Sequence, residues 1–367
     1  MKKIELFNLN ENNQFQNSLI KKINKLITNK NFIKGKEVFN FEKKFSKSIN
    51  IKYCVSCNSG TDALFLILRS FNIGKGDEVI TTAQSWISTS EVIKNCNARP
   101  VFIDTNDDFN INENLIRKKI TKKTKALIVV HLYGYPANIG KIKQICKNNN
   151  ILLIEDCAQA YLSKYKNKFV GTFGDASAFS FFPTKNLGAF GDSGCAVTND
   201  KLTFQKLRML ANHGSKDRKN FIYDGINSRM DTIQAIVLTE KLKKIKKEVI
   251  HKQKLSKIYY NLLKNNKEIS LPKYKKDRFT NFHLFTIKAN QRSKLKEYLK
   301  KNGIETGIYY DFLLPNLKTN KSKNLGKYQN AKNNLSKILS FPINKNLSKV
   351  DVENICKHVN LFYSKGK

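Results

Sequence analysis

The chain has 367 residues, of which 40% are hydrophobic, and 67 basic against 29 acidic residues give it a formal net charge of +38. This length allows one large domain with a buried core and a second, smaller one. The lysines are spread along the whole chain, and no nucleic-acid recognition module accompanies them. We therefore expect no nucleic-acid partner, although such a surface would attract an anionic substrate.

Cysteine usage and hydropathy are typical of a cytoplasmic protein. The seven cysteines are scattered, and the single C-x-x-C pair, Cys54 and Cys57, has no second pair at zinc-site spacing. We expect reduced thiols and no metal. The first residues, MKKIELFNLNENNQ, lack the apolar run of a signal peptide, and no stretch reaches the apolar length of a membrane span.

The N-terminal part is predicted to be helical and then to enter a sheet. Residues 20–27 and 37–49 carry apolar residues at helical spacing. After a short strand around Val55, the small-residue turn at 58–61 opens a helix over 62–71. Free N–H groups at such a helix start can bind a phosphate. A plain capped helix, with Ser59 or Thr61 as its cap, is the alternative.

Strands and helices then alternate, which predicts a parallel, doubly wound sheet. The predicted strands cover 78–82, 100–104 and 126–130, and the predicted crossover helices cover 111–120 and 139–148. His131 follows the third strand. It either faces a ligand or makes a structural hydrogen bond.

The stretch 151–188 organises the predicted site. Its first apolar run, 151–154, ends in Glu155 and Asp156, and a second strand, 176–182, is followed by Lys185. Ligands of open α/β sheets bind beyond the carboxyl ends of the strands, so one acid and one lysine should meet at that edge. A lysine amine forms Schiff bases, and a carboxylate can hold a protonated pyridine nitrogen. This pair predicts pyridoxal phosphate (PLP) chemistry.

Three motifs carry a resemblance to a known family. The segments EDCAQA (155–160), FSFFPTKNLGAFGDSG (179–194) and CNSGTDAL (57–64) resemble the DegT/DnrJ/EryC1/StrS family of PLP-dependent sugar aminotransferases. The resemblance implies PLP fold type I, which is aspartate-aminotransferase-like, with a large, mostly parallel α/β domain and a smaller α+β domain. We place these domains at residues 1–250 and 251–367.

The resemblance also implies roles for individual residues. Lys185 would bind PLP and act as general acid and base, and Asp156 would pair with the pyridine nitrogen. Trp86 would stack on the ring, and Gln159 would contact its hydroxyl. The phosphate would be bound by Gly60, Thr61, Ser180 and, from the partner chain of a homodimer with shared active sites, Asn227.

The remaining elements follow from periodicity. A strand is predicted over 195–198, helices over 202–212, 231–246 and 239–254, a strand–helix–strand unit over 282–289, 295–302 and 304–310, an exposed loop over 316–334 and a last helix over 350–363.

By resemblance, the amino group comes from glutamate and passes to C3 of a dTDP- or UDP-linked keto sugar. Phe182, Tyr309 and Tyr310 would line the sugar side. Phe182 stands where tyrosine is frequent in the family, and Tyr309 and Asp311 stand where many members have histidine and proline, which leaves the sugar open. A C4 aminotransferase and a PLP-dependent sugar dehydratase are the alternatives, although the dehydratase branch carries histidine in place of Lys185. A non-catalytic regulatory relative is a more distant one.

Overall fold

The computed structural model describes residues 3–217, 219–320 and 328–364. Its larger part is built on a seven-stranded sheet with the order β1-β9-β8-β5-β4-β2-β3. Only β9 runs against its neighbours, so the predicted α/β fold with a mostly parallel sheet is confirmed. The strands are β1 (Tyr53–Cys57), β2 (Glu78–Thr82), β3 (Arg99–Ile103), β4 (Thr124–Val130), β5 (Leu152–Asp156), β8 (Ala176–Ser180) and β9 (Gly194–Thr198).

Helices cover both faces of this sheet, as continuous apolar strands require. One core contains residues of α2, α5 and α7, and the other contains residues of α3, α4 and α6. The helices of this part are α1 (Asn13–Asn29), α2 (Lys36–Ser48), α3 (Gly60–Ser70), α4 (Ser88–Asn95), α5 (Ile139–Asn148), α6 (Lys201–Leu210) and α7 (Thr232–Leu242).

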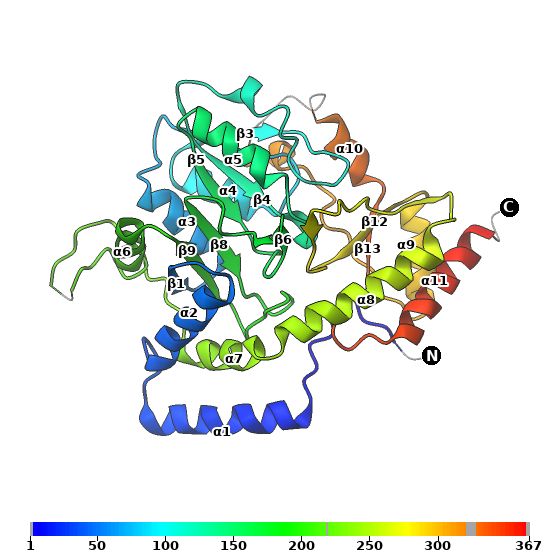
Figure 1. The fold of residues 1–367 in the computed structure, drawn as a ribbon, viewed down its shortest axis with the longest axis horizontal. Coiled ribbons are helices and arrows are strands. Elements are labelled where there is room, and N and C mark those ends of the chain that lie inside the picture. Colours follow the sequence, from blue (N-terminus) through cyan, green and yellow to red (C-terminus); the bar gives the residue numbers. More distant parts are fainter. Residues whose placement is uncertain (1–2, 218, 321–327, 365–367) are drawn as a thin grey trace.

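A smaller part follows, on the right in Figure 1. Its antiparallel sheet, β10-β12-β13, packs through stacked Tyr259, Phe285 and Phe341. The long helix α8 passes through the predicted domain boundary at residue 250. The elements here are α8 (Ile245–Leu263), β10 (Ile269–Ser270), β12 (Phe285–Ala289), α9 (Arg292–Lys301), α10 (Gln329–Leu335), β13 (Ile338–Phe341) and α11 (Lys349–Ser364).

A third small sheet joins the two parts. Strand β11 of the C-terminal half pairs with β6, and β6 pairs with β7. These strands are β6 (Lys164–Tyr165), β7 (Lys168–Phe169) and β11 (Arg278–Phe279). Among the described residues, no helix combines the length and apolarity needed to cross a bilayer.

The crossover helix predicted over 111–120 is wrong. This segment is irregular except for a 3₁₀ turn at Arg117–Lys119. Asp108 and Asn112 accept hydrogen bonds from the backbone N–H groups two residues ahead. Such side-chain bonds offer the backbone an alternative to a helix. The apolar periodicity that suggested a helix instead reflects burial of Ile111 and Ile116 in the core.

The helices predicted over 231–246 and 239–254 are two helices with a break between them. Lys243 and Lys244 donate their N–H groups to carbonyls three residues back, which tightens the chain where α7 ends. The break lets α7 pack on α1 and α2 while α8 packs on α11. Periodicity alone does not reveal a change of packing partner.

Two predictions in the C-terminal half also fail. The strand expected over 304–310 forms only isolated bridges, from Ile304 to Ile4 and from Gly307 to Ser340. The exposed loop expected over 316–334 lies partly outside the described residues, at 321–327. Its last part belongs to α10, where Ala331 and Asn334 are buried.

The aromatic core under β8 generates a stability prediction. Phe45 of α2 is fully buried and contacts the rings of Phe179 and Phe181, with centroids 5.1 and 5.2 Å away. We expect Phe45→Ala to lower the free energy of unfolding by about 3–5 kcal/mol in guanidinium titrations. Phe39→Ala on the exposed face of the same helix should cost less than about 1 kcal/mol. Equal losses in the two variants would contradict this core.

Candidate active site

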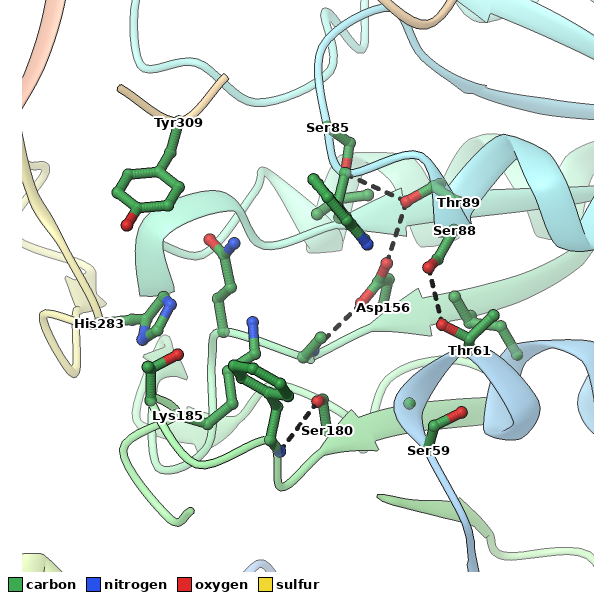
Figure 2. Close-up of a pocket in the computed structure, with 18 of the residues that line it drawn as sticks. Ser59, Thr61, Ser85, Ser88, Thr89, Asp156, Ser180, Lys185, His283 and Tyr309 are labelled. Atoms are coloured by element: carbon green, nitrogen blue, oxygen red, sulfur yellow. Dashed lines mark hydrogen bonds between the residues drawn. The ribbon is translucent and has the colours of Figure 1, made fainter. Parts of the chain in front are cut away.

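A cavity of about 590 Å³ opens at the carboxyl ends of β5 and β8 (Figure 2). The two strands pair in parallel, with Asp156 opposite Ala178, so both end at the same edge of the sheet. Asp156, the last residue of β5, and Lys185, in the loop after β8, both line the cavity. The geometry therefore brings together the acid and the lysine that the sequence singled out.

Asp156 is buried and held by two hydrogen bonds. The Thr89 hydroxyl donates to Oδ2 at 3.2 Å, and the Ala158 N–H donates to Oδ1 at 3.1 Å. Burial raises the pKa of this carboxyl above its usual value, while the Ala158 N–H and the Lys185 charge act against the rise. Any further N–H donor or positive charge in the cavity would stabilise the ionised form of this buried carboxyl group.

Lys185 extends into the same space. The residue is partly exposed to the cavity, but the surrounding protein desolvates its amine. Burial lowers the pKa of Lys185 to about 8, and the attraction of Asp156 opposes that shift. A substantial fraction of the amine is thus neutral, and nucleophilic, near physiological pH.

The start of α3 forms the other end of the cavity. Ser59 caps the helix by accepting the N–H of Asp62 at 3.0 Å, and the first N–H groups have no partner within the helix. A Cβ at Gly60 would lie 2.7 Å from Cβ of Ser180, so only glycine permits this approach. The Thr61 and Ser88 hydroxyls are 2.7 Å apart. Free N–H groups, a helix dipole and hydroxyls in one place can bind an anion.

Trp86 and Phe182 border the mouth of the cavity. Trp86 is 52% exposed and Phe182 is 47% exposed, although both line it. Two large aromatic side chains left in solvent at one opening are typical of a ligand site rather than of a core. Gln159 lies deeper, where Oε1 accepts the N–H of Tyr133 at 2.6 Å and Nε2 donates to the Tyr310 hydroxyl at 3.1 Å.

Tyr309 and Tyr310 line the cavity from the smaller part, as the sequence suggested. Asn227 does not line the cavity within this chain. Asn227 is exposed, on a segment attached to α3 through Ser228. The Ser228 hydroxyl donates to Asp62 at 2.6 Å.

Sequence reasoning missed several residues of the cavity wall, and four of them bear on the argument below. Ser88 and Thr89 follow Trp86 in the run SWISTS, whose density of hydroxyls was the available signal. Phe7 and His283 also line the cavity. No local pattern marks these two, because they reach the site only through long-range packing.

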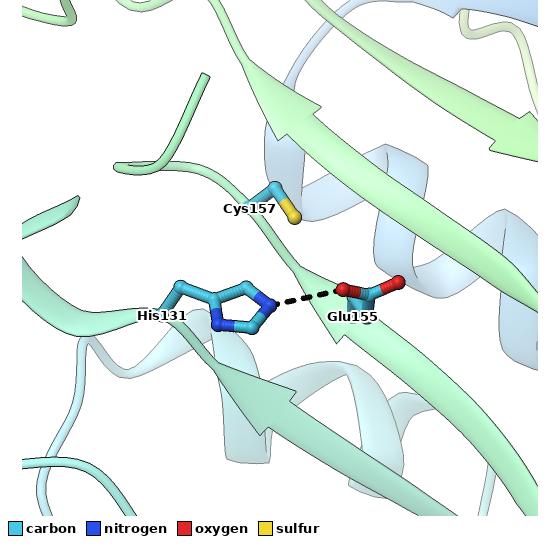
Figure 3. Close-up of side chains that lie close together, drawn as sticks. All are labelled: His131, Glu155 and Cys157. Atoms are coloured by element: carbon cyan, nitrogen blue, oxygen red, sulfur yellow. Dashed lines mark hydrogen bonds and ion pairs between the residues drawn. The ribbon is translucent and has the colours of Figure 1, made fainter. Parts of the chain in front are cut away.

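Near the cavity, His131, Glu155 and Cys157 lie within metal-binding distance of one another (Figure 3). Nδ1 of His131 accepts the Ala137 N–H at 3.0 Å, so Nε2 carries the proton that it donates to Glu155, also at 3.0 Å. Glu155 accepts three backbone N–H groups besides. No imidazole lone pair is left for a metal, so His131 is a structural hydrogen-bonding residue.

Comparison with known proteins finds relatives that match most of this chain. A dTDP-3-amino-3,6-dideoxy-alpha-D-galactopyranose transaminase of Aneurinibacillus thermoaerophilus is 35% identical over 357 residues, which cover 96% of this chain and 97% of that protein. A pleiotropic regulatory protein of Geobacillus stearothermophilus is 37% identical over 300 residues, 81% of each chain. The crystal structure of DesV from S. venezuelae is 30% identical, with a TM-score of 0.96 and 99% of both chains covered.

The family model itself matches nearly the whole chain. Residues 13–360 match the DegT/DnrJ/EryC1/StrS aminotransferase family. This range contains the sheet, the cavity edge and most of the smaller part. The chain therefore belongs to the DegT/DnrJ/EryC1/StrS aminotransferase family, the PLP-dependent sugar aminotransferases.

Proposed function

We propose that the protein is a homodimeric aminotransferase that uses PLP to move an amino group from glutamate to C3 of a dTDP- or UDP-linked keto sugar. The observation that carries this proposal is the approach of Lys185 and Asp156 in one cavity above the open N-terminus of α3. An amine, an acid and an anion site in this order match the aldehyde, pyridine nitrogen and phosphate of PLP.

The residues present fit that cofactor. Gly60 lets Ser180 lie close to the start of α3, so the N–H groups there and the Ser180 hydroxyl would bind the phosphate together. Asp156, with its raised pKa, would be relieved by the N–H of a protonated pyridine. Trp86 would cover one face of the ring, and Gln159 would approach its hydroxyl. Bound PLP would supply the electron sink for the transfer.

Lys185 would then move the protons. Its neutral amine would take the proton from the α-carbon of glutamate. The ammonium group formed in this way would deliver a proton later in the same half-reaction. The sugar half would use the same steps in reverse order. Arginine could not replace this lysine, because a guanidinium stays charged and forms no bond to the aldehyde carbon.

The sugar would occupy the mouth of the cavity, between Phe182 and the two tyrosines Tyr309 and Tyr310. Aromatic faces pack well on the C–H faces of a pyranose. The assignment of C3 and of a dTDP carrier is supported by the A. thermoaerophilus relative, whose name specifies a 3-amino dTDP sugar. Amination at C4 is the nearest alternative.

Homodimerisation with shared sites would complete the cavity. Figure 1 shows the loop after α6 extending away from the sheet. Phe221 is 65% exposed and Ile222 is 52% exposed on this loop, shortly before Asn227. Apolar side chains on a projecting loop would be covered by a second copy, which would bring Asn227 to the partner's phosphate site.

A regulatory role is the second candidate, because one relative is named a pleiotropic regulatory protein. It predicts salt-sensitive binding to DNA without any lysine-linked cofactor. The presence of both Lys185 and Asp156 favours the enzyme.

The linkage prediction concerns Lys185. Borohydride treatment of the purified protein should leave pyridoxyl mass on the peptide that contains Lys185, and Lys185→Ala should lower release of 2-oxoglutarate from glutamate by at least about 10³-fold. Lys241→Ala is the matched control, since burial also lowers the pKa of Lys241 to about 8, yet Lys241 lies outside the cavity. Mass on the Lys241 peptide would refute the assignment.

The pH prediction concerns capture of PLP by the cofactor-free protein. Only the neutral amine reacts, so the rate should rise with pH through about 8 and then level off, well below the ordinary lysine value of 10.5. Asp156 raises the Lys185 pKa, so in Asp156→Asn the midpoint should move to lower pH. Stopped-flow absorbance measures both rates; a midpoint near 10 would contradict the desolvated amine.

The shared-site prediction uses mixed dimers. Lys185→Ala and Asn227→Ala chains, each inactive alone, should regain about a quarter of wild-type activity after equal mixing, because half of the dimers then contain one intact site. If Asn227 served its own chain, every site in the mixed dimer would keep one defect. Absence of recovery, with exchange verified by native mass spectrometry, would therefore exclude sharing.

A further inference from the structure

The imidazole of His283 lines the cavity, and one of its two ring nitrogens has no hydrogen-bond partner among the described residues. His283 is 5% exposed, and its Nδ1 has no hydrogen-bond partner among the described residues. Figure 2 shows the ring on the side of Lys185 away from Asp156, in the wall that the smaller part provides. Buried polar atoms are rarely left unpaired, so an unpaired one in a cavity wall points to a ligand.

His283 is anchored once through its ring and once through its backbone. Phe7 stacks on it, with centroids 6.2 Å apart and an interplanar angle of 29°. The backbone N–H of His283 donates to Asn281 Oδ1 at 3.0 Å. Asn281 in turn donates to the carbonyls of Gln159 and Tyr161. The imidazole is therefore fixed relative to the loop that carries Gln159, as a recognition group should be.

The surroundings keep this imidazole neutral. Burial, and then the positive charges of Lys185 and Lys252, hold the pKa of His283 far below its ordinary value. A neutral imidazole has one N–H donor and one acceptor nitrogen. That pair suits an alcohol, which can donate and accept at once, whereas a carboxylate would favour the charged form.

We propose that His283 is a specificity-determining residue that binds a hydroxyl group of the sugar substrate. This inference rests on the proposed function and identifies which wall of the cavity the sugar faces. Phe7 and Tyr309, which contact each other edge to face at 6.1 Å, would pack beside the same pyranose. The amino-acid donor, whose polar groups are charged, would not depend on His283.

Separate measurement of the two half-reactions tests the proposal. His283→Leu should leave the glutamate half-reaction within about twofold of wild type but lower kcat/KM for the keto sugar by about 10- to 100-fold, the effect of one lost hydrogen bond in a buried site. His283→Asn, which keeps a polar group near the Nδ1 position, should recover most of that loss. Equal losses in both halves, or no recovery with asparagine, would overturn the proposal.

A binding measurement separates this inference from the proposed function. The chain has five histidines, so ¹³C labelling of histidine Cε1 gives a readable NMR spectrum in which the His283 signal is identified by its loss in His283→Asn. Addition of unreactive dTDP-glucose or UDP-N-acetylglucosamine should shift that signal, and glutamate should not. The His251 signal should stay, because its ring pairs with the Leu347 carbonyl at 2.8 Å.

Absence of a shift with both nucleotide sugars would overturn the role of His283. A shift without turnover of any nucleotide-linked keto sugar by the wild-type enzyme would uphold the sugar-facing wall and reject the transamination proposal instead. The two conclusions can therefore fail separately.

Discussion

Parallel pairing of β5 with β8 is the constraint on which the site depends. The register places Ile154 opposite Ala176 and Asp156 opposite Ala178, so the acid and the loop that carries Lys185 emerge at one edge. Strand side chains alternate between faces, and a slip by one residue would turn Asp156 away from the cavity. Fully buried alanines in β8 leave room for helix α3 to approach that edge.

The two adjacent carboxylates at the end of β5 are both buried, but they differ in how many hydrogen-bond donors surround them. Glu155 points to the opposite face, where backbone N–H groups and His131 satisfy it, and its pKa stays low despite the cost of burial. Asp156 has fewer donors, and burial raises its pKa. The satisfied carboxylate fixes the loop around Gly171, and the less satisfied one is available to a ligand.

The sequence predicted that the acid and the lysine would meet at one edge of the sheet, because both lie on local segments. A strand ending in an acid, a strand followed by lysine and a small-residue turn before a helix each keep their meaning without knowledge of the rest of the fold. Local reasoning failed where side chains or distant segments compete with periodicity. Hydrogen bonds between the backbone and the side chains of asparagine and aspartate replace the helix that was expected over 111–120. Residues around 304 pair with the N-terminal segment instead of forming a regular strand.

The cavity wall that contains Phe7 and His283 is assembled from distant segments, which explains why the sequence did not reveal these two residues. The N-terminal segment is fixed to the smaller part through the Ile4–Ile304 bridge, and to the residue just before α8 through the 2.6 Å ion pair between Glu11 and Lys244. These two attachments place Phe7 between them, against His283. A wall made this way can change with a few substitutions while the edge that carries Asp156 and Lys185 stays intact. We infer that tertiary packing between distant segments determines substrate choice in this chain, whereas two neighbouring strand ends supply the groups for its chemistry.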